Sequence, residues 1–130
     1  MSKGKVLIID DEEIVRMSCQ RILVPEGYEV RTVASAKEGF GILEKDRYDV
    51  VLTDLKMPDI DGIEVLARVK KDWPEVEVIM VTGYQTIHTA VQAIKLGAFD
   101  YLEKPFTPDG IISAIEKAVD HMGKKEQARS

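Results

Sequence analysis

Residues suited to phosphoryl chemistry follow four separate, largely apolar runs of the chain. The runs comprise residues 6–9, 50–53, 78–81 and 99–103. Asp10 and Asp11 follow the first run, and Asp54 follows the second. Thr82 follows the third run, and Lys104 follows the fourth. If the runs are neighbouring parallel strands, their carboxyl ends bring these groups to one edge of a sheet. Such an edge has the groups that a metal-dependent phosphorylation site requires.

The carboxylates at this edge favour a bound cation. Carboxylates that lie close together repel one another, and without a cation some of them take up protons. Mg²⁺ prefers oxygen ligands, uses one or two carboxylates, keeps several waters and recruits phosphate oxygens. We therefore predict Mg²⁺, for which Mn²⁺ can substitute, with Asp11 and Asp54 as direct ligands and Asp10 acting through water. The backbone carbonyl of Lys56 is a further predicted ligand. Asp10 and Asp11, taken singly, would equally suit the cap of a helix.

Asp54 is the predicted nucleophile, because a carboxylate can accept a phosphoryl group as an acyl phosphate. Phosphoryl transfer depends mainly on positioning and on neutralising charge. The Lys104 ammonium and the Thr82 hydroxyl are the groups expected to contact the phosphoryl oxygens. The bond between Lys104 and Pro105 can be cis, an isomer that would direct the lysine into the site.

The elements that must position these residues follow from the apolar pattern. In the segments between and after these runs, apolar residues recur at helical spacing. This pattern predicts helices over residues 12–23, 36–43, 63–72, 87–96 and 109–122. A further short strand is predicted over residues 28–33. Strands joined by helical crossovers form a parallel sheet, and the common doubly wound order of five strands is 2-1-3-4-5. We therefore predict an α/β three-layer sandwich in which the first and third strands, with Asp10 and Asp54, are neighbours.

Length and composition describe one soluble domain. The chain has 130 residues, of which 45% are hydrophobic and 32% are charged. No apolar run reaches the roughly 20 residues that span a bilayer, and no signal segment precedes the first strand, so we expect a cytoplasmic protein without membrane contact. The net charge of −5 gives no support for direct nucleic-acid binding. Cys19 is the single cysteine and is expected in the core.

At this point the sequence resembles a known family, the receiver domains of two-component response regulators. The resemblance covers residues 5–121, and it depends on the ordered set Asp10-Asp11, Asp54, Met57-Pro58, Asp61-Gly62, Thr82-Gly83 and Lys104-Pro105. The stretch 90–106 is most similar to receivers attached to ATPase-type transcriptional activators.

The resemblance implies a flavodoxin-like fold and a signalling role. It implies that Asp54 takes a phosphoryl group from the phosphohistidine of a sensor histidine kinase or of a histidine phosphotransfer protein. The domain would assist its own phosphorylation and dephosphorylation without turning over an external substrate. Thr82 would then move toward the phosphoryl group and Tyr101 would turn inward, which alters the surface of the fourth helix, fifth strand and fifth helix.

The resemblance also implies a domain organisation. Residues 1–122 would form the receiver, and residues 123–130 a polar tail or the start of a linker to an output domain such as a transcriptional activator. Homodimers through the face of the fourth and fifth helices are a habit of this family. Lys56 and Tyr84 would flank the mouth of the site, and we expect the bulky Tyr84 to slow self-hydrolysis.

Other functions are compatible with the same fold. A flavin-binding carrier needs a loop rich in Ser, Thr or Gly after the first strand, whereas here Asp10, Asp11 and Glu12 would repel a phosphate. An aspartate-nucleophile phosphatase usually has Asp-x-Asp at that place, and this chain does not. A degenerate receiver that serves only as an interaction module would lack some of the matching residues, and all of them are present.

Overall fold

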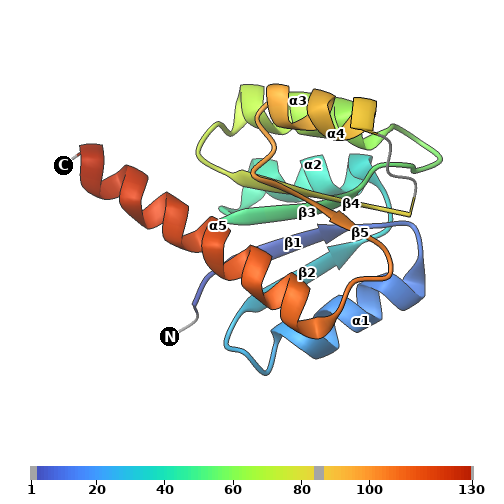
Figure 1. The fold of residues 1–130 in the computed structure, drawn as a ribbon, viewed down its shortest axis with the longest axis horizontal. Helices are drawn as coiled ribbons and strands as arrows, with labels where there is room; N and C mark the ends of the chain where they lie inside the picture. Colours follow the sequence, from blue (N-terminus) through green and yellow to red (C-terminus); the bar gives the residue numbers. More distant parts are fainter. Residues whose placement is uncertain (1–2, 84–86, 130) are drawn as a thin grey trace.

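The fold is an alternation of five strands and five helices (Figure 1). The structure, a computed structural model, describes residues 3–83 and 87–129, with side chains for all of these except 87–88 and 122–129. The strands are β1 (Lys5–Ile9), β2 (Glu29–Val33), β3 (Val50–Asp54), β4 (Glu77–Thr82) and β5 (Asp100–Glu103). The helices are α1 (Glu13–Leu23), α2 (Ala36–Lys45), α3 (Gly62–Asp72), α4 (Ile87–Lys95) and α5 (Pro108–Arg129).

The strands form one parallel sheet in the order β2-β1-β3-β4-β5, so the predicted order is confirmed. Helices α2, α3 and α4 cover one face of the sheet, and α1 and α5 cover the other (Figure 1). In β1, Leu7 and Ile9 belong to the core under α2, α3 and α4, whereas Val6 and Ile8 belong to the core under α1 and α5. The central strands are mostly apolar because both of their faces are buried, and their buried polar residues are Thr53, Asp54, Glu77 and Thr82.

Local signals in the sequence start two of these helices. The Ser35 hydroxyl accepts a hydrogen bond of 3.2 Å from the backbone N–H of Glu38 at the start of α2. At the start of α3, the Asp61 carboxylate accepts a bond of 3.0 Å from the N–H of Glu64. Both bonds satisfy backbone donors that a helix leaves unpaired in its first turn.

Helix α5 continues beyond the apolar pattern that predicted it. The periodic apolar residues end at Met122, but the helical backbone continues to Arg129 through residues expected as a polar tail. Glu, Lys, Gln, Ala and Arg are good helix formers, so this segment supports a helix without an apolar face.

A buried carboxylate ties α5 to the amino end of β4. Glu77 is 3% exposed, and its Oε2 lies 2.8 Å from Nδ1 of His121 on α5. Its Oε1 lies 3.4 Å from the Lys70 ammonium, which also donates to the Val76 carbonyl at 2.8 Å. The His121 ring also packs against Phe99, with 5.2 Å between ring centroids. Opposite charges and hydrogen bonds thus compensate the burial of Glu77.

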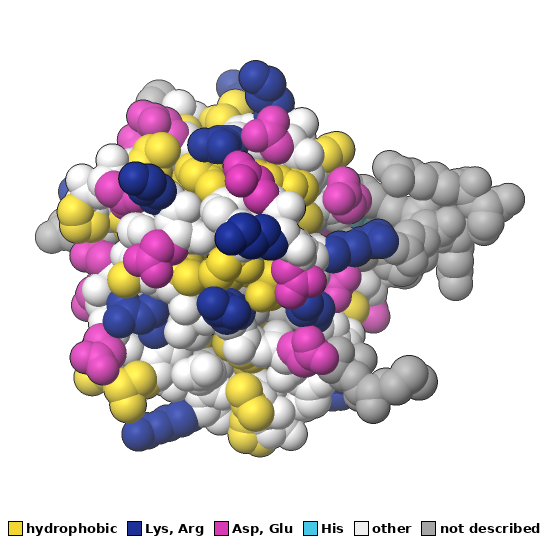
Figure 2. Space-filling model, turned by 180° about the vertical axis from the view of Figure 1, so that it is seen from behind, with side chains coloured by type: hydrophobic (Ala, Val, Ile, Leu, Met, Phe, Trp, Pro, Cys, Tyr) yellow, Lys and Arg dark blue, Asp and Glu magenta, His cyan; other side chains and the backbone are white. Residues whose placement is uncertain are grey.

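The surface mixes charges of both signs. On the face opposite to that of Figure 1, basic and acidic side chains are interspersed, with hydrophobic side chains between them (Figure 2). Among the described residues, no helix combines the length and the apolar character needed to cross a membrane.

Candidate functional site

The residues that follow the strands meet at one edge of the sheet. Asp54 is the last residue of β3 and Thr82 the last of β4, and Asp10 follows β1 directly. Strand pairing sets Ile9 beside Thr53, so the chain leaves β1 next to Asp54. Asp10, Asp54 and Thr82 are 2%, 6% and 1% exposed, respectively. The parallel topology therefore produces a buried polar cluster at the carboxyl edge of a sheet whose central strands are mostly apolar.

Lys104 connects the acidic residues of this edge. Its ammonium lies 3.0 Å from Asp10 Oδ2 and 3.5 Å from Asp54 Oδ2. The same ammonium donates to Glu12 Oε1 at 3.1 Å. The Lys104 backbone N–H donates to the Thr82 carbonyl at 2.9 Å, which fixes this residue at the end of β4. The peptide bond between Lys104 and Pro105 is cis.

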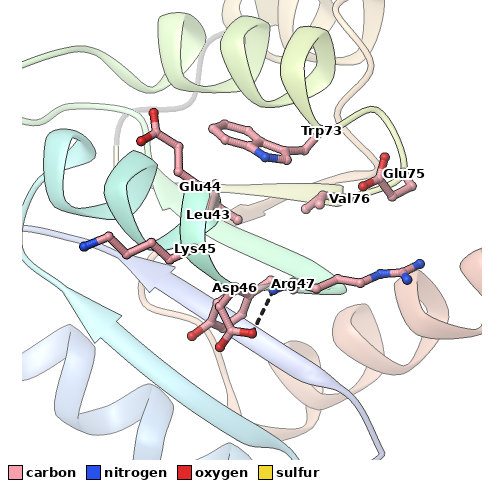
Figure 3. A pocket seen from close by; sticks show the side chains of 9 residues that line it. Leu43, Glu44, Lys45, Asp46, Arg47, Trp73, Glu75 and Val76 are labelled. Carbon is pink, nitrogen blue, oxygen red and sulfur yellow. Dashed lines mark hydrogen bonds between the residues drawn. The ribbon is translucent and has the colours of Figure 1, made fainter.

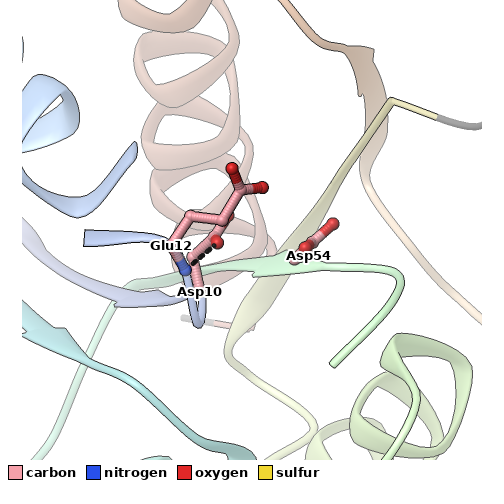
Figure 4. Close-up of side chains that lie close together, drawn as sticks. All are labelled: Asp10, Glu12 and Asp54. Atoms are coloured by element: carbon pink, nitrogen blue, oxygen red, sulfur yellow. Dashed lines mark hydrogen bonds between the residues drawn. The ribbon is translucent and has the colours of Figure 1, made fainter. Parts of the chain in front are cut away.

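The turn after β1 directs two carboxylates to the same space (Figure 4). Asp10 Oδ1 accepts a hydrogen bond of 2.9 Å from the backbone N–H of Glu12. An Asp side chain that bonds the backbone two residues on stabilises a turn of this kind. Asp10 therefore stabilises the turn with one oxygen and faces Lys104 with the other, so its cap-like and site-facing roles coexist.

The start of α3 packs directly beneath Asp54. The Gly62 N–H donates to the Leu55 carbonyl at 2.7 Å. A Cβ at Gly62 would lie only 2.4 Å from the Asp54 carbonyl oxygen. The glycine of the Asp61-Gly62 pair thus allows the helix to approach the backbone that carries Asp54.

Asp54 is held in an environment that disfavours its charge. Burial raises the pKa of Asp54, and the nearby negative charge of Asp10 raises it further. The charge of Lys104 and its hydrogen bond, together with a hydrogen bond from the Lys56 backbone, act in the opposite direction. Because the pKa of Asp54 rises on balance, a bound cation would stabilise the charged form of this carboxylate.

Lys104 remains a strong cation in this setting. Burial alone would lower the pKa of Lys104, because it penalises the ammonium. The hydrogen bond with Asp10 and the charges of Asp10 and Asp54 outweigh burial, so the pKa of Lys104 is raised. The ammonium is therefore available as a fixed positive charge at neutral pH.

The carboxylates that could hold a metal ion are not all those that the sequence indicated. One oxygen each of Asp10, Glu12 and Asp54 lie within 4.8 Å of one another. Two of the three residues are buried, and oxygen donors of this kind suit a hard divalent cation. The sequence pattern did not indicate Glu12 as a metal ligand, although Glu12 lies two residues after Asp10 and has a long side chain. Asp11 is exposed and outside this group, and its assignment as a direct ligand stays a prediction.

Of the other predicted site residues, the structure describes Lys56 and Tyr101. Lys56 is exposed in the loop after β3. Tyr101 packs against the core under α2, α3 and α4, and its hydroxyl is buried with no hydrogen-bond partner among the described residues. Tyr84 lies outside the described residues.

The surface also has hollows outside this site. One of about 330 Å³ lies between the end of α2 and the connection from α3 to β4, and is lined by Leu43, Glu44, Lys45, Asp46, Arg47, Tyr48, Trp73, Glu75 and Val76. Its Lys45 and Arg47 side chains extend away from each other (Figure 3). Its charged groups therefore do not converge on a common point.

Comparison with known proteins identifies the family of this chain. The profile of the response regulator receiver domain matches residues 6–116. The DNA-binding transcriptional regulator NtrC of Proteus hauseri is 36% identical over 127 residues, which cover 98% of this chain and 27% of NtrC. The chain thus spans about a quarter of the length of this curated relative.

Solved structures show the same relationship. A CheY-like receiver domain protein from Methanospirillum hungatei superimposes with a TM-score of 0.89 at 36% identity, covering 93% of this chain and 97% of the other. The beryllofluoride-activated NtrC4 receiver domain dimer gives a TM-score of 0.88 at 36% identity, covering 91% and 98%. These findings do not support a flavin-binding protein or a phosphatase. The chain belongs to the family of response regulator receiver domains of two-component systems.

Proposed function

We propose that this domain accepts a phosphoryl group on Asp54 and thereby controls an attached output domain. The observation that carries the proposal is the convergence of Asp54, Asp10 and Lys104 at the carboxyl edge of the sheet, with 3.0 Å and 3.5 Å from the ammonium to the two carboxylates. This arrangement supplies a nucleophile, a cation-binding carboxylate and a fixed positive charge within one small volume.

The transfer exchanges one bond to phosphorus for another. An Asp54 carboxylate oxygen attacks the phosphorus of a phosphohistidine, and the bond from phosphorus to the imidazole nitrogen breaks. The electron pair of that bond stays on the ring nitrogen, and because the other ring nitrogen of the phosphohistidine carries a proton, the ring leaves as neutral imidazole. The positive charge of Lys104 opposes the negative charge of the incoming group, and the Thr82 hydroxyl is the proposed donor to one of its oxygens.

A divalent cation fits the residues present. The proposed ion is Mg²⁺, with Mn²⁺ as substitute, held by Asp54, Asp11, water-linked Asp10 and the Lys56 carbonyl. When bound, it supplies neutralisation of the phosphoryl charge. The environment of Asp54 supports this part of the proposal, because burial and the charge of Asp10 raise the pKa of Asp54 despite the opposing charge of Lys104, and a bound cation would stabilise the charged carboxylate.

The proposed phosphodonor is a sensor histidine kinase or a histidine phosphotransfer protein in the cytoplasm. The helix that follows the site, α1, has two exposed apolar residues in its first turns, Ile14 at 72% and Met17 at 43%. Exposed apolar side chains beside a reactive group suit contact with the protein that delivers the phosphoryl group.

The proposed output is a change in the surface of α4, β5 and α5. Phosphorylation adds charge and strong acceptor oxygens that only one arrangement of Thr82 satisfies well. The hydroxyl of Tyr101, which is buried without a hydrogen-bond partner among the described residues, supports a role for this ring in the same switch. Residues 1–122 are the proposed receiver, and residues 123–130 begin the connection to an output domain.

Phosphorylation can be tested without a kinase. Incubation of the protein with acetyl phosphate and Mg²⁺, followed by intact mass, is expected to give one phosphate adduct. Asp54→Asn removes the nucleophile and should give none. Asp72→Asn changes an exposed carboxylate at the end of α3 and should keep the adduct. An adduct on Asp54→Asn, or its absence from the wild type, would contradict the proposal.

A further inference from the structure

The Glu12 side chain pairs with a distant residue and does not cap the helix at whose start it lies. Glu12 is the N-cap residue of α1, but its side chain makes no capping hydrogen bond. It extends instead to Lys104, whose ammonium donates to Glu12 Oε1 at 3.1 Å across 92 residues of sequence. The Glu12 side chain is 56% exposed, whereas Lys104 is 16% exposed, so the carboxylate lies at the mouth of the site.

The Lys104 ammonium would compete with a divalent cation for the carboxylates of the site. The ammonium contacts Asp10, Asp54 and Glu12 together. Asp10 and Asp54 are the buried carboxylates proposed to attract the divalent ion. A divalent ion at these two residues would repel the ammonium, because like charges a few ångströms apart repel strongly in a poorly solvated site. Glu12 is the remaining carboxylate already within reach of Lys104.

We propose that Glu12 is a positioning residue that holds the Lys104 ammonium at the mouth of the site when a divalent cation binds Asp10 and Asp54. Lys104 then leaves the two buried carboxylates without leaving the site, and it remains beside the place where the phosphoryl group arrives. The inference rests on the proposed function, because it assigns a role in loading the same site.

The alternative is that Glu12 acts on the cation directly, as a ligand or as a nearby negative charge. Both roles predict that Glu12→Gln weakens cation binding. They differ in whether the effect requires Lys104. A positioning residue loses its effect once its partner is gone, whereas a ligand or a bare charge does not.

A double-mutant cycle separates the two roles. Mn²⁺ is titrated into the wild type, Glu12→Gln, Lys104→Gln and the double variant at fixed pH and ionic strength, and free Mn²⁺ is followed by its EPR signal. We expect Glu12→Gln to weaken Mn²⁺ binding about threefold to tenfold when Lys104 is present, a range typical of coupled neighbours. In the Lys104→Gln background we expect a change of less than about twofold. Lys104→Gln alone should tighten binding, because it removes the competing ammonium.

Two controls complete the design. Glu13→Gln removes the same charge from the next exposed residue, at the start of α1, and should change Mn²⁺ affinity less than about twofold in either background. Urea unfolding of Glu12→Gln should show the same midpoint as the wild type, since an exposed ion pair contributes little to stability. Equal effects of Glu12→Gln with and without Lys104, no effect at all, or no Mn²⁺ binding by the wild type would overturn the inference.

The acetyl phosphate assay on the same samples keeps the two proposals distinguishable. An adduct on the wild type without coupling in the Mn²⁺ cycle overturns the role of Glu12 alone. Coupling in the cycle without an adduct supports the role of Glu12 in cation loading and contradicts phosphorylation of Asp54.

Discussion

Asp54 is a buried carboxylate at the end of a central strand, with the Asp10 carboxylate bound to the same ammonium. Its raised pKa shows that the fold disfavours its charged form. A charged Asp54 therefore makes the fold less stable than an uncharged residue of the same shape would. A raised pKa of this kind is typical of carboxylates at functional sites.

Asp54→Asn should therefore stabilise the metal-free protein. At neutral pH we expect the free energy of unfolding to rise on the order of 1 kcal/mol, since the amide avoids the cost of burying a charge and also relieves the repulsion with Asp10. In the wild type the pKa of Asp54 is higher in the folded than in the unfolded state, so the folded form takes up this proton first as the pH falls. The advantage of Asp54→Asn should accordingly shrink as the pH falls through that pKa. Urea unfolding in EDTA at a series of pH values measures this.

Asp72→Asn serves as the matched comparison at this scale. Its carboxylate is exposed and pairs with Arg68 on the surface at 3.5 Å, so we expect a change within about 0.5 kcal/mol at every pH. A destabilised Asp54→Asn at neutral pH, or a gain that does not vary with pH, would contradict the interpretation of Asp54.

At the scale of elements, the approach of α3 to β3 fixes the geometry of the site. The first residue of α3, Gly62, lies so close to the strand end that a Cβ would be 2.4 Å from the Asp54 carbonyl oxygen and 2.7 Å from Leu55 Cα. Both contacts are with backbone, which cannot turn aside as a side chain can. The loop between Asp54 and Gly62 is therefore held by packing as well as by hydrogen bonds.

Gly62→Ala should displace the end of β3. We expect a loss of about 2 kcal/mol in the free energy of unfolding, typical of overpacking in a core, and slower formation of the acetyl phosphate adduct. Gly41→Ala is the comparison, because Gly41 is inside α2 and a Cβ there meets nothing within 4 Å. That variant should gain up to about 1 kcal/mol from helix propensity and keep the adduct rate. Equal stability changes in the two variants would refute the packing argument.

At the scale of the whole molecule, α4 has an unpartnered apolar surface. Val91 and Ile94 are 46% and 53% exposed, and Leu96, just beyond the helix, is 39% exposed. The related NtrC4 receiver was solved as a beryllofluoride-activated dimer. We propose that phosphorylation of this domain promotes a homodimer through the face of α4 and α5, since the switch alters that face.

Ile94→Glu should prevent this association. Sedimentation velocity with beryllofluoride and Mg²⁺ is expected to show a dimer for the wild type and a monomer for Ile94→Glu, because burial of the new charge opposes the interface. Val24→Glu makes the same change at an exposed residue, 51% accessible, at the end of α1, and should still dimerise. A dimer of Ile94→Glu, or a monomeric Val24→Glu, would exclude the α4 face as the interface.

The sequence by itself determined the strands, the helices and the order in which functional residues follow the strands. Apolar runs of strand length and helical periodicity are local properties, and the strand order then followed from the few topologies that right-handed crossovers allow. The position of Asp54 beside Asp10 could be predicted for this reason, as could the arrival of Thr82 and Lys104 at the same edge.

Only the tertiary structure decided which side chains of that edge meet. Glu12 contacts Lys104, 92 residues away in the sequence, whereas Asp11 faces solvent. The directions of these side chains follow from the turn, in which Asp10 accepts a hydrogen bond from the Glu12 backbone N–H. The buried hydroxyl of Tyr101 likewise depends on packing between β5 and the core under α2, α3 and α4. Spacing along a chain fixes where a residue enters a site, but the direction of a long side chain depends on neighbours that folding alone brings together.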